Sequence, residues 1–238
     1  MALRKADDER VPVRVERTHE GTVARLVQVL LDAGIDGLGP LKSAQEMAQS
    51  SRQSSRSTDA AVTKVARNHV AKGGVGGFVT GVGGFLTMPI ALPANVVEFY
   101  IGATRMVAAI ADLRGYDIND PQVRTAVLLT LVGSDADDVL KRAGLTSGTS
   151  GPSGKVIGLA AQQLPPAGLL MLNKAIGFRI LRGVGEKAFS RLGRGVPLAG
   201  GMLGGGVDMW MMKRIADHAM NEFPPLDPGP LVVRATQP

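Results

Sequence analysis

The stretch that decides the fold is GGVGGFVTGVGGFLTMPIALPANVVEFYIGATRMVAAIADL, residues 73–113. It carries no charge before Glu98, so its first part is long enough to cross a bilayer, which takes roughly 20 apolar helical residues. Seven glycines and two prolines in that part argue against one spanning helix, because an interior glycine costs about 1 kcal/mol relative to alanine. We therefore expect a helical hairpin that is re-entrant, interfacial or buried.

Small residues in this stretch recur at helical spacing. Gly73, Gly77 and Gly81 fall on every fourth residue, and a second row of small residues runs from Gly76 to Gly84. Such rows let another helix approach closely. The glycine pattern is therefore predicted to be a packing device.

The second half of the stretch is predicted to be a charged helix. Pro89 and Pro93 predict a break, after which a new helix runs to about Leu113. That helix carries a stripe of charge on an otherwise apolar surface, at a spacing of seven residues: Glu98, Arg105 and Asp112. The stripe either faces solvent or needs partners from other helices, because buried charges are costly unless paired. The candidate partners are Arg124, Asp208 and Arg214.

Composition favours an all-α protein, a single multi-helix bundle with Gly-rich, Pro-interrupted helical hairpins. Hydrophobic residues make up 45% of the 238 residues and aromatic residues only 4%, with 31 glycines, so helices are expected to pack through small side chains. Cysteine is absent and only three histidines occur, which removes thiol nucleophiles and Cys-based zinc sites. We expect no metal, no cofactor and no nucleic-acid partner.

The chain divides into three parts. Residues 1–20 are polar and predict a flexible extension without a signal peptide, residues 21–223 predict one helical domain, and residues 224–238 form a Pro-rich tail. Within the domain, a first amphipathic helix is expected to end at Gly34. The Ser-rich residues 43–59 predict a linker or a solvated helix.

A basic segment at residues 174–194 is the best candidate for a membrane surface. Its apolar residues gather on one side of a helical wheel and most of its cations lie away from them, as in a helix that rests on anionic lipid. The alternative is a plain solvated amphipathic helix. The candidate membrane-surface residues are Lys174, Arg179, Arg182, Lys187, Arg191 and Arg194.

No motif in the sequence specifies a reaction. GTSGPSGK at residues 148–155 lacks the first glycine and the final Ser/Thr of a phosphate-binding loop. Neither Ser150 nor Ser153 has the glycine spacing of a hydrolase elbow. The catalytic residues are therefore unknown.

Three stretches together resemble the EcsC protein family of bacteria. They are the Gly-rich residues 73–113, the turn RGYDINDPQVR at 114–124 and RGVPLAGGMLGGGVDMWMMKRIADHAMNEF at 194–223. The resemblance implies an α-helical, often membrane-linked protein, for which a hydrolase role has been suggested. The candidate positions of the family turn are Tyr116, Asp117, Asp120 and Pro121.

From these observations we expect a non-enzymatic accessory protein in the cytoplasm, associated with the inner face of the membrane. Its expected partners are membrane lipids or a membrane protein complex, and a homo-oligomer is kept open. One alternative is a soluble helical protein that binds lipid or another apolar ligand. A second alternative is a hydrolase whose nucleophile is unidentified.

Overall fold

The computed structural model describes residues 25, 27–82, 88–132 and 197–226. Within these ranges the chain is helical or in turns and contains no β-strand, which confirms the predicted all-α class. A helical segment at residues 27–31 continues into the π-helical turn η1 (Asp32–Asp36). The further helices are α2 (Ala44–Gln53), α3 (Thr58–Val82), α4 (Met88–Leu113), α5 (Pro121–Val132) and α9 (Pro197–Glu222).

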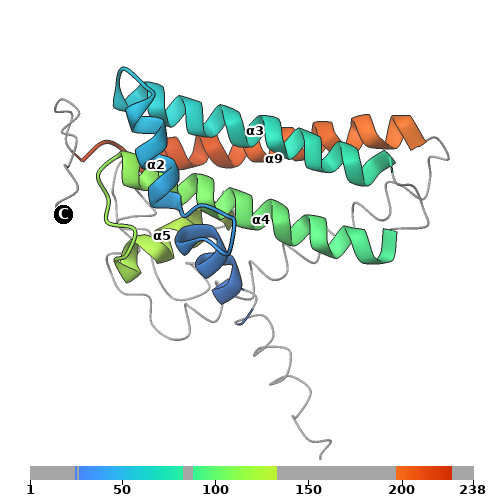
Figure 1. Ribbon diagram of the computed structural model, residues 1–238, viewed down its shortest axis with the longest axis horizontal. Helices are drawn as coiled ribbons and strands as arrows, with labels where there is room; N and C mark the ends of the chain where they lie inside the picture. Colours follow the sequence, from blue (N-terminus) through green and yellow to red (C-terminus); the bar gives the residue numbers. More distant parts are fainter. Residues whose placement is uncertain (1–24, 26, 83–87, 133–196, 227–238) are drawn as a thin grey trace, which may run out of the picture.

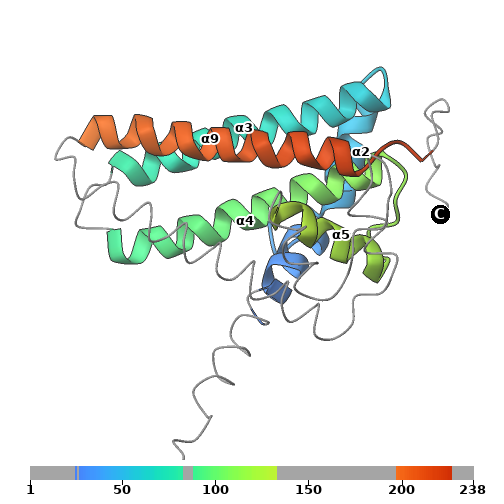
Figure 2. The same ribbon diagram turned by 180° about the vertical axis from the view of Figure 1, so that it is seen from behind.

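Three long helices form the body of the molecule (Figure 1). α3 runs antiparallel to both α4 and α9, and its most extensive contact is with α9 (Figures 1 and 2). α2 and α5 lie against α4 at the end where α3 begins and where α4 and α9 finish. We call this the polar end; the opposite end is formed by the end of α3 and the beginnings of α4 and α9.

The hairpin region is arranged differently from the sequence prediction in one respect. α3 ends at Val82 and α4 begins at Met88, so the prediction that Pro89 and Pro93 precede the new helix is wrong. Pro89 falls in the first turn of α4, where the N–H that proline lacks has no partner within the helix. α4 continues through Pro93. In the described ranges no helix is both long and apolar enough to cross a bilayer.

Among the glycines whose surroundings the structure describes, the two with the tightest surroundings, Gly34 and Gly37, are not in the predicted rows. A Cβ at Gly34 would lie 2.6 Å from Thr104 Cβ on α4, whereas a Cβ at Gly73 would meet α9 at 3.5 Å, an ordinary contact. Gly34 therefore lets η1 approach α4 closely. The first helix does not end there as predicted, because η1 continues to Asp36.

α4 is the central element of the core. Residues 106–111 are all buried, and alanine occupies three of these six positions. Because alanine adds little volume, helices can pack against α4 on several sides, and α2, α3, α5, α9 and η1 all contact it. This agrees with a composition that is rich in small apolar residues and poor in aromatic ones.

The Ser-rich residues 43–59 contain a well-defined helix. Ser43 and Glu46 form a capping box at the start of α2: the Ser43 hydroxyl accepts from the Glu46 N–H (3.1 Å) and the Glu46 carboxylate accepts from the Ser43 N–H (2.9 Å). Ala44 and Ala48 are fully buried on one face and Ser51 is nearly so. Of the two alternatives, a helix is present over residues 44–53, and one face of it packs against the protein.

Candidate functional site

The charged stripe predicted on α4 occupies the least buried side of that helix. Glu98 is exposed, while Arg105 and Asp112 are half-buried. The backbone carbonyl of Asp112 accepts a hydrogen bond from Arg52 Nη2 on α2 (3.3 Å). The stripe therefore runs from solvent, at Glu98, to a part of α4 that α2 covers.

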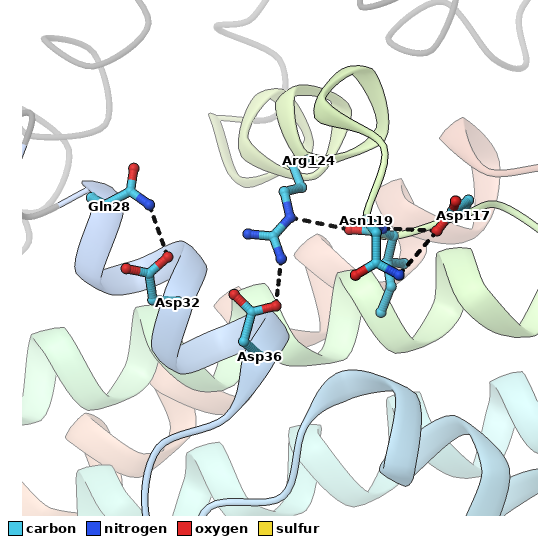
Figure 3. Close-up of polar contacts among 7 residues, drawn as sticks. Gln28, Asp32, Asp36, Asp117, Asn119 and Arg124 are labelled. Atoms are coloured by element: carbon cyan, nitrogen blue, oxygen red, sulfur yellow. Dashed lines mark hydrogen bonds and ion pairs between the residues drawn. The ribbon is translucent and has the colours of Figure 1, made fainter.

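Two of the predicted partners of the stripe bind elsewhere. Arg124 on α5 forms an ion pair with Asp36 at the end of η1, and its Nε donates to the backbone carbonyl of Ile118 (3.2 Å), as Figure 3 shows. Arg214 on α9 lies over the ring of Trp210, 5.4 Å from its centroid. Arg124 therefore connects α5 with the end of η1 and with the turn that contains Ile118. It is not the ion-pair partner of the charged stripe.

Arg105 is the unusual member of the stripe. Burial lowers the pKa of its guanidinium. Its Nε is enclosed and has no hydrogen-bond partner among the described residues. Arg114, one residue after the end of α4, also has an enclosed Nε without a hydrogen-bond partner in the described part of the chain, but its Nη1 pairs with Asp59 at 3.0 Å.

His69 on α3 belongs to the same region and was not singled out by its sequence context. Its Nδ1 lies 2.9 Å from the Val65 carbonyl oxygen, and since a carbonyl only accepts, Nδ1 carries the proton in this contact. Burial lowers the pKa of His69; the Val65 hydrogen bond opposes this, and the charges of Lys72 and Arg105 lower the pKa further. His69 is therefore neutral at pH 7, and two cations act on it.

Most polar groups of the turn at residues 114–120 form hydrogen bonds within the turn or with the C-terminal segment. Gly115 has a φ of 95°, which favours glycine. The Tyr116 hydroxyl donates to the Pro224 carbonyl oxygen (3.0 Å), and the Tyr116 ring packs edge-on against Phe223. Burial raises the pKa of the Tyr116 hydroxyl, while Arg114 lowers it.

The acidic residues of this turn act as backbone caps. Asp117 Oδ1 accepts from the backbone N–H of Asn119 (2.9 Å) and from its side-chain amide (3.2 Å), as drawn in Figure 3. Asp120 Oδ1 accepts from the Gln122 N–H (2.7 Å), and Pro121 is the first residue of α5. These contacts match an N-cap followed by proline at N1. In this geometry all four candidate family positions stabilise the connection between α4 and α5.

The outer face of α9 exposes a group of large apolar side chains, a surface that we did not single out from the sequence. Val207, Met209 and Trp210 have exposed fractions of 47%, 44% and 60%. The exposed cations Lys213 and Arg214 lie one turn further along, with Lys213 paired to Asp217 at 2.6 Å. The signal in the sequence was the segment VDMWMMKR, in which tryptophan is followed closely by two cations.

The end of the bundle opposite α2 and α5 contains no charged residue in its three helices. Figures 1 and 2 show that the end of α3 and the beginnings of α4 and α9 lie at the same end of the bundle, where α3 runs close to α9 and α4 stands apart from them. In sequence these are residues 73–82, 88–97 and 197–207, and none is charged. We call these three segments the uncharged end. Lys72, Glu98 and Asp208 are the first charged residues beyond it on each helix.

Two further predictions concern metal sites and the basic segment. No group of His, Asp or Glu suited to a metal ion occurs among the described residues. The candidate membrane-surface residues 174–194 lie outside the described residues, so the amphipathic helix predicted for them stays a prediction.

Comparison with known proteins gives one match. The model of the EcsC protein family matches residues 2–224 of the chain. This is a wider span than residues 73–223, within which the three sequence stretches carry the resemblance, and it includes the Ser-rich region. No curated protein and no solved structure matches the chain.

Proposed function

Since the chain belongs to the EcsC protein family, we propose that it is a peripheral membrane protein that inserts the uncharged end of its bundle into one leaflet. In this proposal it acts as a non-catalytic accessory protein at the inner face of the membrane. Its partners are membrane lipids or a membrane protein complex.

The observation that carries the proposal is the meeting of three uncharged segments at one end of the molecule (Figures 1 and 2). Two of them, residues 73–82 and 88–97, are neighbours in sequence, but residues 197–207 come from a distant part of the chain. Charged side chains are the groups that a bilayer interior excludes most strongly. An end without any charge on three adjacent helices can enter lipid without that cost.

Length supports partial rather than complete insertion. Each uncharged segment has about ten helical residues, which rise about 15 Å in total, whereas the hydrocarbon core of a bilayer is about 30 Å thick. The uninterrupted run from Gly73 to Val97 would be long enough to cross if it were one helix. Divided between antiparallel α3 and α4, it is long enough for one leaflet.

The outer face of α9 supports an interfacial boundary just beyond the uncharged end. Trp210 is exposed there, with Lys213 and Arg214 following it and Lys72 exposed on α3. Tryptophan is enriched at the level of lipid headgroups, and a cation near an anionic surface contributes about 1 kcal/mol. On α9 the exposed tryptophan comes first and the exposed cations follow it, which is the order of layers in a leaflet, while Asp208 beside Trp210 is buried.

Vesicle flotation with a matched pair of variants tests the proposal. Trp210→Glu places a charge at the boundary, whereas Leu226→Glu makes the same kind of change at the polar end, where Leu226 has a similar exposed fraction of 59%. We expect Trp210→Glu to weaken binding at least tenfold, because an indole ring that leaves the interface loses a large apolar contact. Leu226→Glu is expected to bind like the wild type.

Two results would count against this function. The first is a wild-type protein that stays with the aqueous phase at low salt in vesicles containing phosphatidylglycerol. The second is an equal loss of binding in both variants. A monodisperse protein that ignores vesicles but retains lipid detectable by mass spectrometry would support the alternative of a soluble lipid-binding bundle.

A further inference from the structure

Arg105 carries a charge that the described part of the protein leaves without a partner. Its side chain is half-buried, its Nε is enclosed, and neither a hydrogen bond nor an ion pair joins it to another described residue. Withdrawing a charge from water is costly unless another charge or a set of hydrogen bonds compensates. The position therefore has the properties of a site whose anion comes from outside the chain.

The neighbours of Arg105 also favour an anion. Lys72 is exposed one turn after His69 on α3, and the positive charges of Lys72 and Arg105 both lower the pKa of His69. His69 is uncharged and its Nδ1–H is already committed to Val65. The two acidic members of the stripe, Glu98 and Asp112, each lie two turns away from Arg105, and no ion pair joins Arg105 to either of them.

There is room beside Arg105 for a ligand. Gly102 lies one turn before it on the same side of α4, and nothing comes within 4 Å of the position that a Cβ at Gly102 would take. Side chains on a helix lean toward its N-terminus, and α4 begins at the uncharged end. The guanidinium group of Arg105 thus leans toward the boundary marked by Lys72 and Glu98.

We propose that Arg105, assisted by Lys72, binds the phosphate group of an anionic phospholipid whose acyl chains lie along the uncharged end. This inference rests on the proposed function and adds a ligand class to it. Guanidinium binds phosphate through two parallel N–H donors; the Nε of Arg105 is enclosed by protein, so the two terminal Nη groups are the donors offered to the phosphate. The backbone of Arg105 lies about 10 Å beyond that of Glu98 along the helix, farther from the headgroup layer. Its long side chain leans back toward that layer and spans part of this distance.

Binding to two kinds of vesicle tests this site in the full-length protein. Phosphatidylcholine vesicles measure insertion alone, and vesicles that contain phosphatidylglycerol add the anionic headgroup. Arg105→Gln removes the proposed ligand contact, Arg105→Lys keeps the charge without the planar fork, and Arg56→Gln removes one exposed charge from the polar end as a matched control.

We expect Arg105→Gln to lose at least tenfold of the preference for phosphatidylglycerol while its binding to phosphatidylcholine is unchanged. Arg105→Lys should recover only part of the preference. Arg56→Gln should cost no more than about fivefold, the effect of one charge near an anionic surface. Since Arg105 has no partner among the described residues, circular dichroism and the melting temperature should show that Arg105→Gln folds normally.

The outcomes separate this inference from the proposed function. If wild type binds vesicles but Arg105→Gln and Arg56→Gln behave alike, the phosphate site is overturned and membrane association stands. If wild type binds no vesicles, its melting temperature is measured with soluble dihexanoyl-phosphatidylglycerol and with inorganic phosphate. A rise that Arg105→Gln abolishes keeps the phosphate site without the membrane, and inorganic phosphate acting as strongly as the lipid identifies free phosphate as the source. No rise with either compound overturns both proposals.

Discussion

The two ends of the bundle are held together by different means. At the polar end, directional contacts connect segments far apart in sequence: Arg124 with Asp36, Arg114 with Asp59, and Tyr116 with Pro224. At the uncharged end, residues 73–82, 88–97 and 197–207 offer no charge with which to form an ion pair. One end is thus fixed by specific side-chain contacts, and the other has no charged residue in its three helix segments.

The residues that stabilise the fold and the residues for which a function is proposed lie in different parts of the molecule. The acidic residues that resembled functional positions, Asp117 and Asp120, lie at the polar end and cap the backbone. The region with an uncompensated charge, at Arg105, lies between the two ends.

The largest effect on the free energy of unfolding is expected for a substitution that disrupts packing at the polar end and leaves the outer face of α9 unchanged. Phe223 is fully buried and packs edge-on against Tyr116, with ring centroids 5.3 Å apart. Phe223→Ala should lower the free energy of unfolding by about 3–5 kcal/mol, the usual cost of removing a core aromatic ring. Urea denaturation followed by circular dichroism measures this change.

Trp210→Ala is the control for that comparison. Because Trp210 is 60% exposed, its removal should change the free energy of unfolding by about 0.5 kcal/mol or less. Equal destabilisation by the two variants would mean that the two ends contribute alike to stability, and the contrast between them would be lost.

A smaller effect is expected from Gly34, which sets how closely η1 approaches α4. A Cβ there would lie 2.6 Å from Thr104 Cβ, so Gly34→Ala should destabilise the protein by about 1–3 kcal/mol through overpacking. Gly102→Ala on α4 meets no atom within 4 Å and should instead be neutral or stabilise by up to about 1 kcal/mol. Thermal unfolding of the two variants distinguishes these signs, and a loss in both would contradict the packing described for Gly34.

The smallest effect concerns pH and His69, near the boundary between the ends. Its pKa in the folded protein is lowered, chiefly by burial, so the unfolded chain binds a proton more readily than the folded one. Stability contributed by the neutral ring is therefore present above the ordinary histidine pKa of about 6.5 and is lost as pH falls below it. The slope from one proton is at most about 1.4 kcal/mol per pH unit.

Urea denaturation between pH 7 and pH 5 measures that slope. His69→Gln keeps an N–H donor for the Val65 carbonyl but does not titrate, so its stability should depend less on pH in this range. An identical slope in wild type and variant would assign the pH dependence to other groups.

Much of the fold could be predicted from local patterns. The Gly-rich, uncharged residues 73–97 predicted a hairpin rather than a single span, and the structure has antiparallel helices on either side of residues 83–87. Asp120-Pro121 predicted the start of α5, and the cap is present. These features depend on backbone hydrogen bonds and side-chain sizes within a few residues of each other, so they can be predicted from the local sequence.

The candidate site was less predictable. The spacing of Glu98, Arg105 and Asp112 correctly placed them on one side of a helix, but not their different exposures, because exposure depends on α2 covering only part of α4. The Ser-rich residues 44–53 lack a large apolar face, and only packing against other helices buries Ala44 and Ala48. His69 gave no signal, since its pKa depends on Lys72 and on Arg105 from another helix.

By itself, the sequence determined the all-α fold class of the described residues, the absence of cysteine chemistry, the start of α5 at Asp120-Pro121, and membership of the EcsC protein family. Only the tertiary structure decided that α9 is the main partner of α3, that Arg124 binds Asp36, and that three uncharged helix ends meet. The reason is physical: helix propensity and capping act over about four residues, whereas partner choice depends on the fit of surfaces from distant segments. The uncharged end, and the position of Arg105 near it without a partner among the described residues, arise only when these distant segments pack together.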